Sequence, residues 1–388
     1  MFFRIILIGL LALYSFTIGV TGQTSTNIKW KHYSLFQEDY SLDTLRKEQL
    51  FVHINNLNFF KNNEYKNDFV TGQTLVGLYL EPSIDYYADE KTRIRAGIHL
   101  LKYHGRDSFD KIAPIFSVQH RANEHLDIIF GTIRGTANHG LLEPIMGFEK
   151  HLIDHYENGM QFLVKYPRVK ADVWLNWEQF IKKNDPFREM FTAGSNIYIN
   201  IHEENQWHFG VPIQVLIRHR GGEIDSSNMP ADTKSNSSIG MLLEWIPDNK
   251  YLKSISLEHN LLIFREINPG GHINITYGQG MYSLLGTDTK YGSFQLGLWQ
   301  GYNYFSPHGE ALFLSSSLKH PDSYTTERMM LTIKYEYKRR LTDFLDLALR
   351  IEPYYHFNTH RMDHSWSLYL ILNKDFFLRE ARNEKPKQ

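Results

Sequence analysis

Apolar and polar residues alternate strictly along much of this chain. Between Thr92 and Leu100, apolar residues hold the even positions, and arginine, glycine and histidine hold odd ones. Side chains of a β-strand point alternately to its two faces, so such a segment has one apolar face and one charged face. The pattern predicts a strand that separates an apolar environment from a polar one.

The same alternation recurs through most of the sequence and predicts about 16 strands of an all-β, antiparallel transmembrane β-barrel. The predicted strands are 49–61, 72–87, 91–103, 111–121, 125–134, 158–166, 169–180, 190–202, 207–219, 237–246, 252–265, 272–285, 291–302, 326–338, 342–356 and 364–376. Residues 88–90, 122–124, 167–168, 203–206 and 339–341 are the short connections, which predict periplasmic turns opposite longer external loops. Residues 305–324 are assigned to an external loop, which keeps the strand number even.

A secreted β-sandwich or propeller would also alternate, but its apolar face would point inward. Here the apolar parities are long aliphatic runs nearly free of charge, while the opposite parities carry both signs together with glycine and asparagine. A lipid-facing exterior and a wet interior account for this more simply, so the barrel is favoured over the sandwich.

The first residues resemble a secretion signal. A short basic start, Met1 to Arg4, precedes an apolar run from Ile5 to Val20, and small residues follow up to Gly22. We expect cleavage near Gly22, before Gln23; an uncleaved anchor helix is the alternative. The chain has no cysteine, which excludes a lipoprotein signal, disulfides and thiolate chemistry.

Composition narrows the class further. Among 388 residues, 42 Lys and Arg balance 43 Asp and Glu, so nothing suggests a nucleic-acid partner. A mean hydropathy of −0.40 excludes a bundle of membrane-spanning helices. The 23 Tyr, 25 Phe and 7 Trp nevertheless form a heavy aromatic load, which is typical of strands whose ends lie at the two membrane interfaces.

These features divide the chain into a signal peptide (1–22), a periplasmic N-terminal segment (23–47), the barrel (48–377) and a charged tail (378–388). The N-terminal segment contains Trp30, Tyr33, Phe36 and Tyr40. One interpretation is that this segment folds against the periplasmic mouth or into the lumen. The other is that it is an ordered lead-in without a function, and both interpretations stay open. The aromatic end of the last strand matches the signal that barrel-insertion machinery recognises.

Several short segments resemble an uncharacterised, porin-like group of Bacteroidota-type outer-membrane barrel proteins. They are Gly22-Gln23, residues 55–65, residues 96–101, Asn138-His139-Gly140 with Glu143-Pro144, and residues 219–225. The resemblance spans most of the mature chain. It implies the barrel fold and an outer-membrane location in a Gram-negative bacterium, and it implies no mechanism.

Charged residues on the polar parities are expected to line the lumen. The predicted pore-lining residues are Glu81, Asp85, Arg93, Arg95, Asp172, Glu178, Arg218, Lys334, Glu336, Asp346, Arg350 and Glu352. Opposed acidic and basic side chains in a lumen select small hydrophilic solutes. The alternative is that these charges pair across strands and satisfy one another in a filled barrel.

The loop from Gly135 to Glu157 is too apolar for a loop in water. Leu141, Leu142, Glu143 and Pro144 are its predicted constriction residues. It either folds into the mouth and narrows the pore, or covers the rim without gating.

Catalytic and metal-binding motifs are weak. Residues 104–108 collect a histidine, an aspartate and a serine, but proximity in sequence does not show the geometry that nucleophilic catalysis needs. His219 with Glu223 and Asp225, or Asp107 with Asp110, offer only loose cation ligands. We therefore predict no cofactor, no metal site and no enzyme, with an outer-membrane lipid hydrolase as the less favoured alternative.

The predicted function is passive diffusion of small hydrophilic solutes through an outer-membrane channel. The main alternative is a non-conducting barrel that anchors or assembles cell-surface components. Expected partners are outer-membrane lipid, the solutes and the insertion machinery, with a homo-oligomer as a further option.

Overall fold

The computed structural model describes residues 30–380, apart from residues 34, 39–40, 223–229, 269–274 and 321–322. The predicted signal peptide lies outside the described residues, as do Glu223 and Asp225 and the tail from residue 381. Within the described part, no helix has the length and apolarity needed to cross a bilayer.

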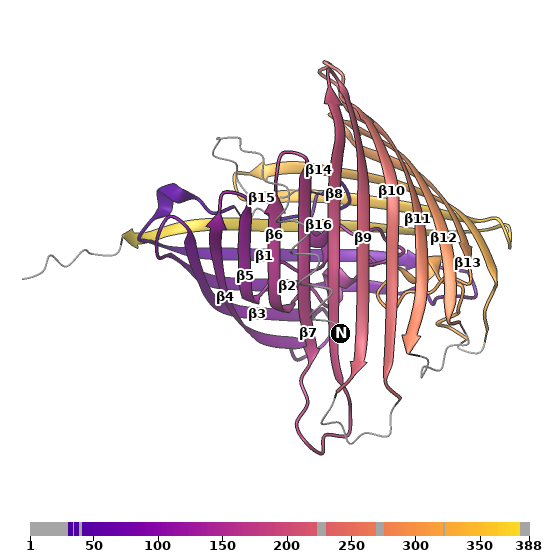
Figure 1. The fold of residues 1–388 in the computed structure, drawn as a ribbon, viewed down its shortest axis with the longest axis horizontal. Helices are drawn as coiled ribbons and strands as arrows, with labels where there is room; N and C mark the ends of the chain where they lie inside the picture. Colours follow the sequence, from indigo (N-terminus) through magenta and orange to yellow (C-terminus); the bar gives the residue numbers. More distant parts are fainter. Residues whose placement is uncertain are drawn as a thin grey trace, which may run out of the picture.

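Sixteen antiparallel strands form one closed barrel, in which each strand pairs with its neighbours in sequence and β1 pairs with β16 (Figure 1). The predicted fold class is therefore confirmed. The strands are β1 (Gln49–Glu64), β2 (Thr74–Tyr87), β3 (Thr92–Tyr103), β4 (Lys111–Asn123), β5 (Leu126–Thr132), β6 (Asn158–Lys165), β7 (Val169–Gln179), β8 (Glu189–Glu204), β9 (Trp207–Gly221), β10 (Asp232–Trp245), β11 (Leu252–Asn268), β12 (Tyr277–Thr289), β13 (Gly292–Tyr302), β14 (Glu327–Thr342), β15 (Leu345–His356) and β16 (Arg361–Glu380).

Buried polar residues lie on the inner face of the barrel wall, and the outer face is apolar. On β11, Ser256, Glu258 and Asn260 are buried, whereas Leu257 and Leu261 are more than half exposed. This is the alternation read from the sequence, and it places the aliphatic parity against lipid. The turn after β14 differs most from the prediction: β14 continues to Thr342, so the chain reverses at residues 343–344 instead of 339–341.

The wall is uneven in height (Figure 1). β8 to β12 have 13 to 17 residues, whereas β5 has 7 and β6 has 8. A strand needs about 9–11 residues to cross the hydrocarbon core, so the β5–β6 hairpin forms a low point in the wall. It is low at the end carrying the longer loops, because β5 and β6 are joined there by residues 133–157.

Three segments fill the lumen. Among the described residues, they are the N-terminal segment from residue 30 to β1, which includes η1 (Thr44–Arg46), the β5–β6 loop with η2 (Thr136–His139) and α2 (Lys150–Ile153), and the part of the β13–β14 loop that contains η3 (Ala311–Phe313). Trp30, Leu141, Ile145, Leu312 and Phe313 belong to one buried apolar cluster. The segment around Trp30 therefore packs inside the barrel, and the β5–β6 loop enters the lumen instead of covering the rim.

Candidate functional site

The β5–β6 loop is fastened to the inner wall by a buried histidine. His139 of η2 lies between two carboxylates, with Nδ1 2.9 Å from Asp172 of β7 and Nε2 3.1 Å from Glu157. Its ring stacks on Trp174, with the ring centroids 3.6 Å apart. Burial alone would lower the pKa of His139, but the charges of Asp172 and Glu157 outweigh it and raise the pKa to about 9. The histidine is therefore held protonated as an ionic clasp.

A second ionic network holds the middle of the same loop. Glu143 contacts Lys334 of β14 and lies 2.6 Å from Nη2 of Arg350 on β15. Arg350 in turn contacts Glu336 and Glu352. Burial alone would raise the pKa of Glu143, but Lys334 and Arg350 lower it below its usual value. These charges satisfy one another around the loop.

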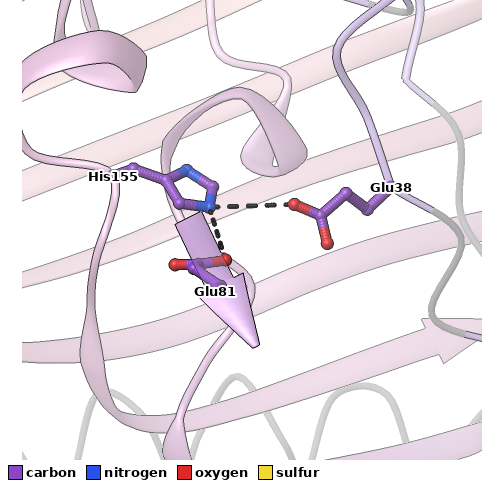
Figure 2. Close-up of side chains that lie close together, drawn as sticks. All are labelled: Glu38, Glu81 and His155. Atoms are coloured by element: carbon purple, nitrogen blue, oxygen red, sulfur yellow. Dashed lines mark ion pairs between the residues drawn. The ribbon is translucent and has the colours of Figure 1, made fainter. Parts of the chain in front are cut away.

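The candidate site lies where the end of the loop meets the wall of β1 to β4. Figure 2 shows the imidazole of His155 between the carboxylates of Glu38 and Glu81, which come from the N-terminal segment and β2. Nε2 of His155 is 3.7 Å from Oε1 of Glu38 and 3.8 Å from Oε2 of Glu81. Segments far apart in sequence thus place two acids and one base together inside the lumen.

Neighbouring side chains orient these three groups. Asn55 of β1 donates from Nδ2 to Glu38 (2.8 Å) and to Glu81 (2.9 Å), and Nδ1 of His99 on β3 lies 2.7 Å from Oε1 of Glu81. Tyr79 stacks on His155, with the ring centroids 4.7 Å apart. The acids therefore have little freedom to move apart.

The spacing of the three groups suits either a proton or a small cation. Their nearest ligand atoms lie within 4.8 Å of one another. Metal–oxygen and metal–nitrogen bonds of about 2.0–2.2 Å would span such a gap, and a protonated imidazole would also balance one carboxylate. Glu38, Glu81 and His155 are the residues that would hold a metal. The Asn55 amide already bridges the two acids, so the three side chains do not need a metal ion to hold them together.

A small cavity adjoins this group. It has a volume of about 30 Å³, and its polar side is formed by His53, Glu81, Ser83, Arg93 and Arg95, together with His155. Its remaining wall contains Ile115 and Ser117 from the first half of β4, Thr132 and Ile133 at the end of β5, and Tyr156 before β6. The lining of the cavity thus combines charged groups with hydroxyl-bearing and apolar side chains.

The predicted pore-lining residues fall into separate groups on the inner wall. Glu81 belongs to the candidate site, Asp85 pairs with Arg95, Asp172 with His139, Glu178 with Thr192, Arg218 with Met190, Lys334 with Glu143, Asp346 with Lys338, and Arg350 with Glu336 and Glu352. The constriction residues Leu141, Leu142 and Glu143 are buried in the lumen, with Pro144 beside them in the chain. Their roles in selectivity stay predictions.

Sequence reasoning missed Glu38, His99 and His155. His99 carried a usable signal, because it lies on the same parity as Arg93 and Arg95. Glu38 and His155 lie on irregular segments, where no periodicity indicates which way a side chain points. The candidates at Asp107 and Asp110 lie in the exposed loop between β3 and β4 instead, and Asp110 pairs with Arg106.

Comparisons with known proteins give a family and a fold. The family model described as lipid A 3′-O-deacylase-type matches residues 42–381. Among solved structures, the outer membrane protein OprD from Pseudomonas aeruginosa is similar at a TM-score of 0.51 and 9% identity, covering 86% of this chain and 96% of that one. OccAB1 from Acinetobacter baumannii has a TM-score of 0.51 and 8% identity, covering 91% and 100%. No curated protein matches.

The family match corrects one prediction. The chain was predicted not to be an enzyme, because no residue pattern in the sequence showed a catalytic arrangement. A match of the deacylase-type model across nearly the whole barrel overturns that prediction. The likeness to OprD and OccAB1, at this level of identity, concerns the barrel fold of outer-membrane proteins alone.

Proposed function

The chain belongs to the lipid A 3′-O-deacylase-type family, and from this premise we propose that it hydrolyses an acyl ester of lipid A or of a similar acylated saccharide. The observation that carries the proposal is the meeting of Glu38, Glu81 and His155 beside a cavity lined by both charged and apolar side chains. The barrel interior would hold the polar part of the substrate, while the acyl chain would lie toward the wall.

The chemistry of the cavity suits ester cleavage. Carboxylates such as Glu38 and Glu81 accept hydrogen bonds from saccharide hydroxyls, and an imidazole between them can serve as a general acid or base. Arg93 and Arg95 line the same cavity, and a cation close to a reacting carbonyl stabilises the oxyanion that develops there. The filled lumen keeps bulk water away, which strengthens each of these interactions.

Substrate access is supported by the low point of the wall. The β5–β6 hairpin is too short to cross the hydrocarbon core, and the cavity-lining residues Ile133 and Tyr156 lie at its upper ends. In the orientation expected for outer-membrane barrels, longer loops face outward, so this low point opens to the outer leaflet. A lipid anchored in that leaflet would reach the cavity sideways.

The proposal is tested by acyl release. The folded chain would be mixed with lipid A in detergent micelles, and released fatty acid would be measured by mass spectrometry. We expect Glu81→Gln and His155→Ala each to lower the rate by about 10²-fold or more, since each removes a group that touches the substrate.

Matched controls come from the opposite side of the lumen. Glu258 of β11 is buried and lies 3.2 Å from His32, and His308 is a buried histidine that lies 3.0 Å from Thr192. Glu258→Gln and His308→Ala should leave the rate within about threefold of the unmodified chain. A wild-type chain that is folded yet releases no fatty acid from any acylated saccharide would refute the proposal.

Solute diffusion is the second candidate. The inner wall carries both charges, and a cavity of about 450 Å³ lined by Lys31, Arg168, Lys170 and Glu244 lies near the short turn at residues 167–168. These features favour a wet vestibule that small solutes enter. Passage beyond it requires the lumenal segments to move.

We also propose, from the sequence and fold together, that the chain resides in the outer membrane of a Gram-negative bacterium after cleavage near Gly22. A Bacteroidota source and a homo-oligomer stay predictions. N-terminal sequencing of the membrane-inserted protein and its mass in detergent would test the cleavage site and the oligomer, respectively.

A further inference from the structure

A second cavity approaches the candidate site from the other side. It has a volume of about 190 Å³, against about 30 Å³ for the cavity beside Glu81 and His155. Its lining comes from the N-terminal segment, from α2 and from β1, β2 and β14 to β16, including the turn between β14 and β15. This β14–β15 cavity therefore lies where the first and last strands of the barrel meet.

The outer end of the β14–β15 cavity lies at a short turn. Asp343 and Phe344 form this turn and line the cavity, together with Arg340, whose side chain is 73% exposed. Asn373 of β16 is exposed beside the turn and donates its backbone N–H to the carbonyl oxygen of Phe344 (3.3 Å). Short turns of outer-membrane barrels face the periplasm, so this end opens to periplasmic water.

The inner end of the same cavity is deeply buried. Leu57, Tyr79 and His151 line it, and each is at most 3% exposed. Tyr79 stacks on His155, and Nδ1 of His151 lies 3.1 Å from Nδ1 of His155. The cavity thus extends from exposed residues at the turn to residues in direct contact with the candidate site.

The candidate site forms the partition between the two cavities. Glu38 and Asn55 line the β14–β15 cavity, whereas Glu81 and His155 line the smaller one. The Asn55 amide donates to both carboxylates, so its two hydrogen bonds join groups from the two sides. A molecule in either cavity would therefore meet the same cluster of side chains.

Ester cleavage needs a second reactant beside the lipid. The oxygen of one water bonds to the carbonyl carbon, the bond from this carbon to the saccharide oxygen breaks, and that oxygen takes one of the protons of the water. On the proposed access route, the acylated saccharide would fill the smaller cavity with its chains in hydrocarbon, which leaves water no entry on that side. A cavity needs only about 10–15 Å³ to hold one water that has polar partners, so the β14–β15 cavity has room for several.

We propose that the β14–β15 cavity is a water-filled path from the periplasm, and that it supplies the water that ester cleavage consumes. The inference rests on the proposed function and deepens it, because it assigns the two reactants to opposite sides of the candidate site. Charged groups along the path hold water by hydrogen bonds; they include Glu38 and the pair Lys338 and Asp346, whose charged atoms lie 3.0 Å apart. The lipid arrives from the outer leaflet and the water from the periplasm, and they meet at the Asn55 bridge.

Thiol labelling tests the path independently of catalysis. The chain has no cysteine, so Ile371→Cys, which lines the cavity opposite Leu57, would carry its only thiol. We expect a charged, water-soluble methanethiosulfonate to label this thiol in the folded barrel in detergent micelles. Adding Asn373→Trp, which obstructs the outer end, should slow the labelling by at least about tenfold, because the reactivity of a thiol depends on its access to solvent. Lys374→Trp, on the outer face of the same strand, should leave the labelling rate unchanged.

Fatty-acid release tests the supply of water. With lipid A in micelles, Asn373→Trp should lower kcat by at least about tenfold and leave KM within about twofold, because it obstructs the water and not the lipid. Asn373→Ser, which removes the amide without adding bulk, and Lys374→Trp should leave both parameters within about twofold. If Asn373→Trp does not fold, Asn373→Cys modified after folding with a benzyl methanethiosulfonate takes its place.

The outcomes separate the path from the hydrolase. An Ile371→Cys barrel that is folded and resists the reagent would show a closed void and overturn the path. Labelling that Asn373→Trp blocks while fatty-acid release continues unchanged would show that the water enters elsewhere, which overturns the supply of water by this cavity. A barrel whose labelling shows an open path, but which releases no fatty acid from any acylated saccharide, would refute the hydrolase and support the path.

Discussion

His139 illustrates how a single ionisable residue holds an irregular segment inside a barrel. Burying a charge is costly unless it is paired, and here Asp172 from the wall and Glu157 from the far end of the same loop supply two partners. The histidine therefore ties both ends of the lumenal loop together and to β7. Its protonation should be coupled to the stability of the loop.

This coupling predicts a pH dependence with a definite sign. The pKa of His139 is about 9 in the folded protein, against about 6.5 for an unfolded chain. The stabilisation is fully present below pH 6.5 and is lost as pH rises through 9, amounting to about 3 kcal/mol at most. Urea unfolding between pH 6 and 10 should show the loss in the wild type and not in His139→Gln. If the free energy of unfolding depended on pH equally in the two proteins, His139 would not be the residue that couples protonation to the stability of the loop.

Residue positions on strands were predictable, whereas their partners were not. Parity alone placed Glu81, Asp85 and Arg95 on the inner face, because alternation is a property of the local chain. The contact of Glu81 with His155 depends on where a loop some 70 residues later folds. His53 and Asp375 meet only because the barrel closes between its first and last strands.

At the scale of elements, the β5–β6 hairpin explains both the low wall and the inward turn of its loop. Gly131 and Gly159 are directly opposed near its end, and both have positive φ. Such a backbone conformation suits glycine and bends a strand away from the regular sheet. The sequence predicted both strands of the hairpin. It could not decide where the loop between them lies, because apolar residues such as Leu141 indicate burial without indicating the place of burial.

Replacing Gly131 tests this bend. In Gly131→Ala, the new Cβ would lie 2.1 Å from the carbonyl oxygen of Phe116, at a φ of +96°. We expect a loss of about 1–3 kcal/mol in the free energy of unfolding and reduced fatty-acid release, because the cavity wall at Ile133 shifts. Gly105→Ala is the control: its φ is +84°, and nothing lies within 4 Å of its added Cβ. Similar losses in both variants would show that backbone strain, and not the collision, is responsible.

At the scale of the whole molecule, a filled lumen separates this barrel from an open pore with the same strand number. Tyr33, Met146 and Phe313 come from three different segments, and all are buried inside the wall. Some of the charges that the sequence suggested for solute selection pair with these segments, as Lys334 does with Glu143, and others pair within the wall, as Arg95 does with Asp85. A polar parity predicts a wet or a filled interior equally well, because both need polar groups on the inner face.

Removing one filling segment should distinguish the two interiors. Thr132 and Asn158 are directly paired, so an Asn-Gly turn can replace residues 133–157 and close the hairpin without altering the wall. In planar bilayers, we expect the wild-type barrel to be silent and this variant to give discrete ohmic steps, while its fatty-acid release is lost together with His155. Shortening the exposed β3–β4 loop at residues 104–110 should change neither property. Conductance of the wild type equal to that of the variant would mean that the segments move aside, and diffusion through the lumen would then become the better account of the barrel.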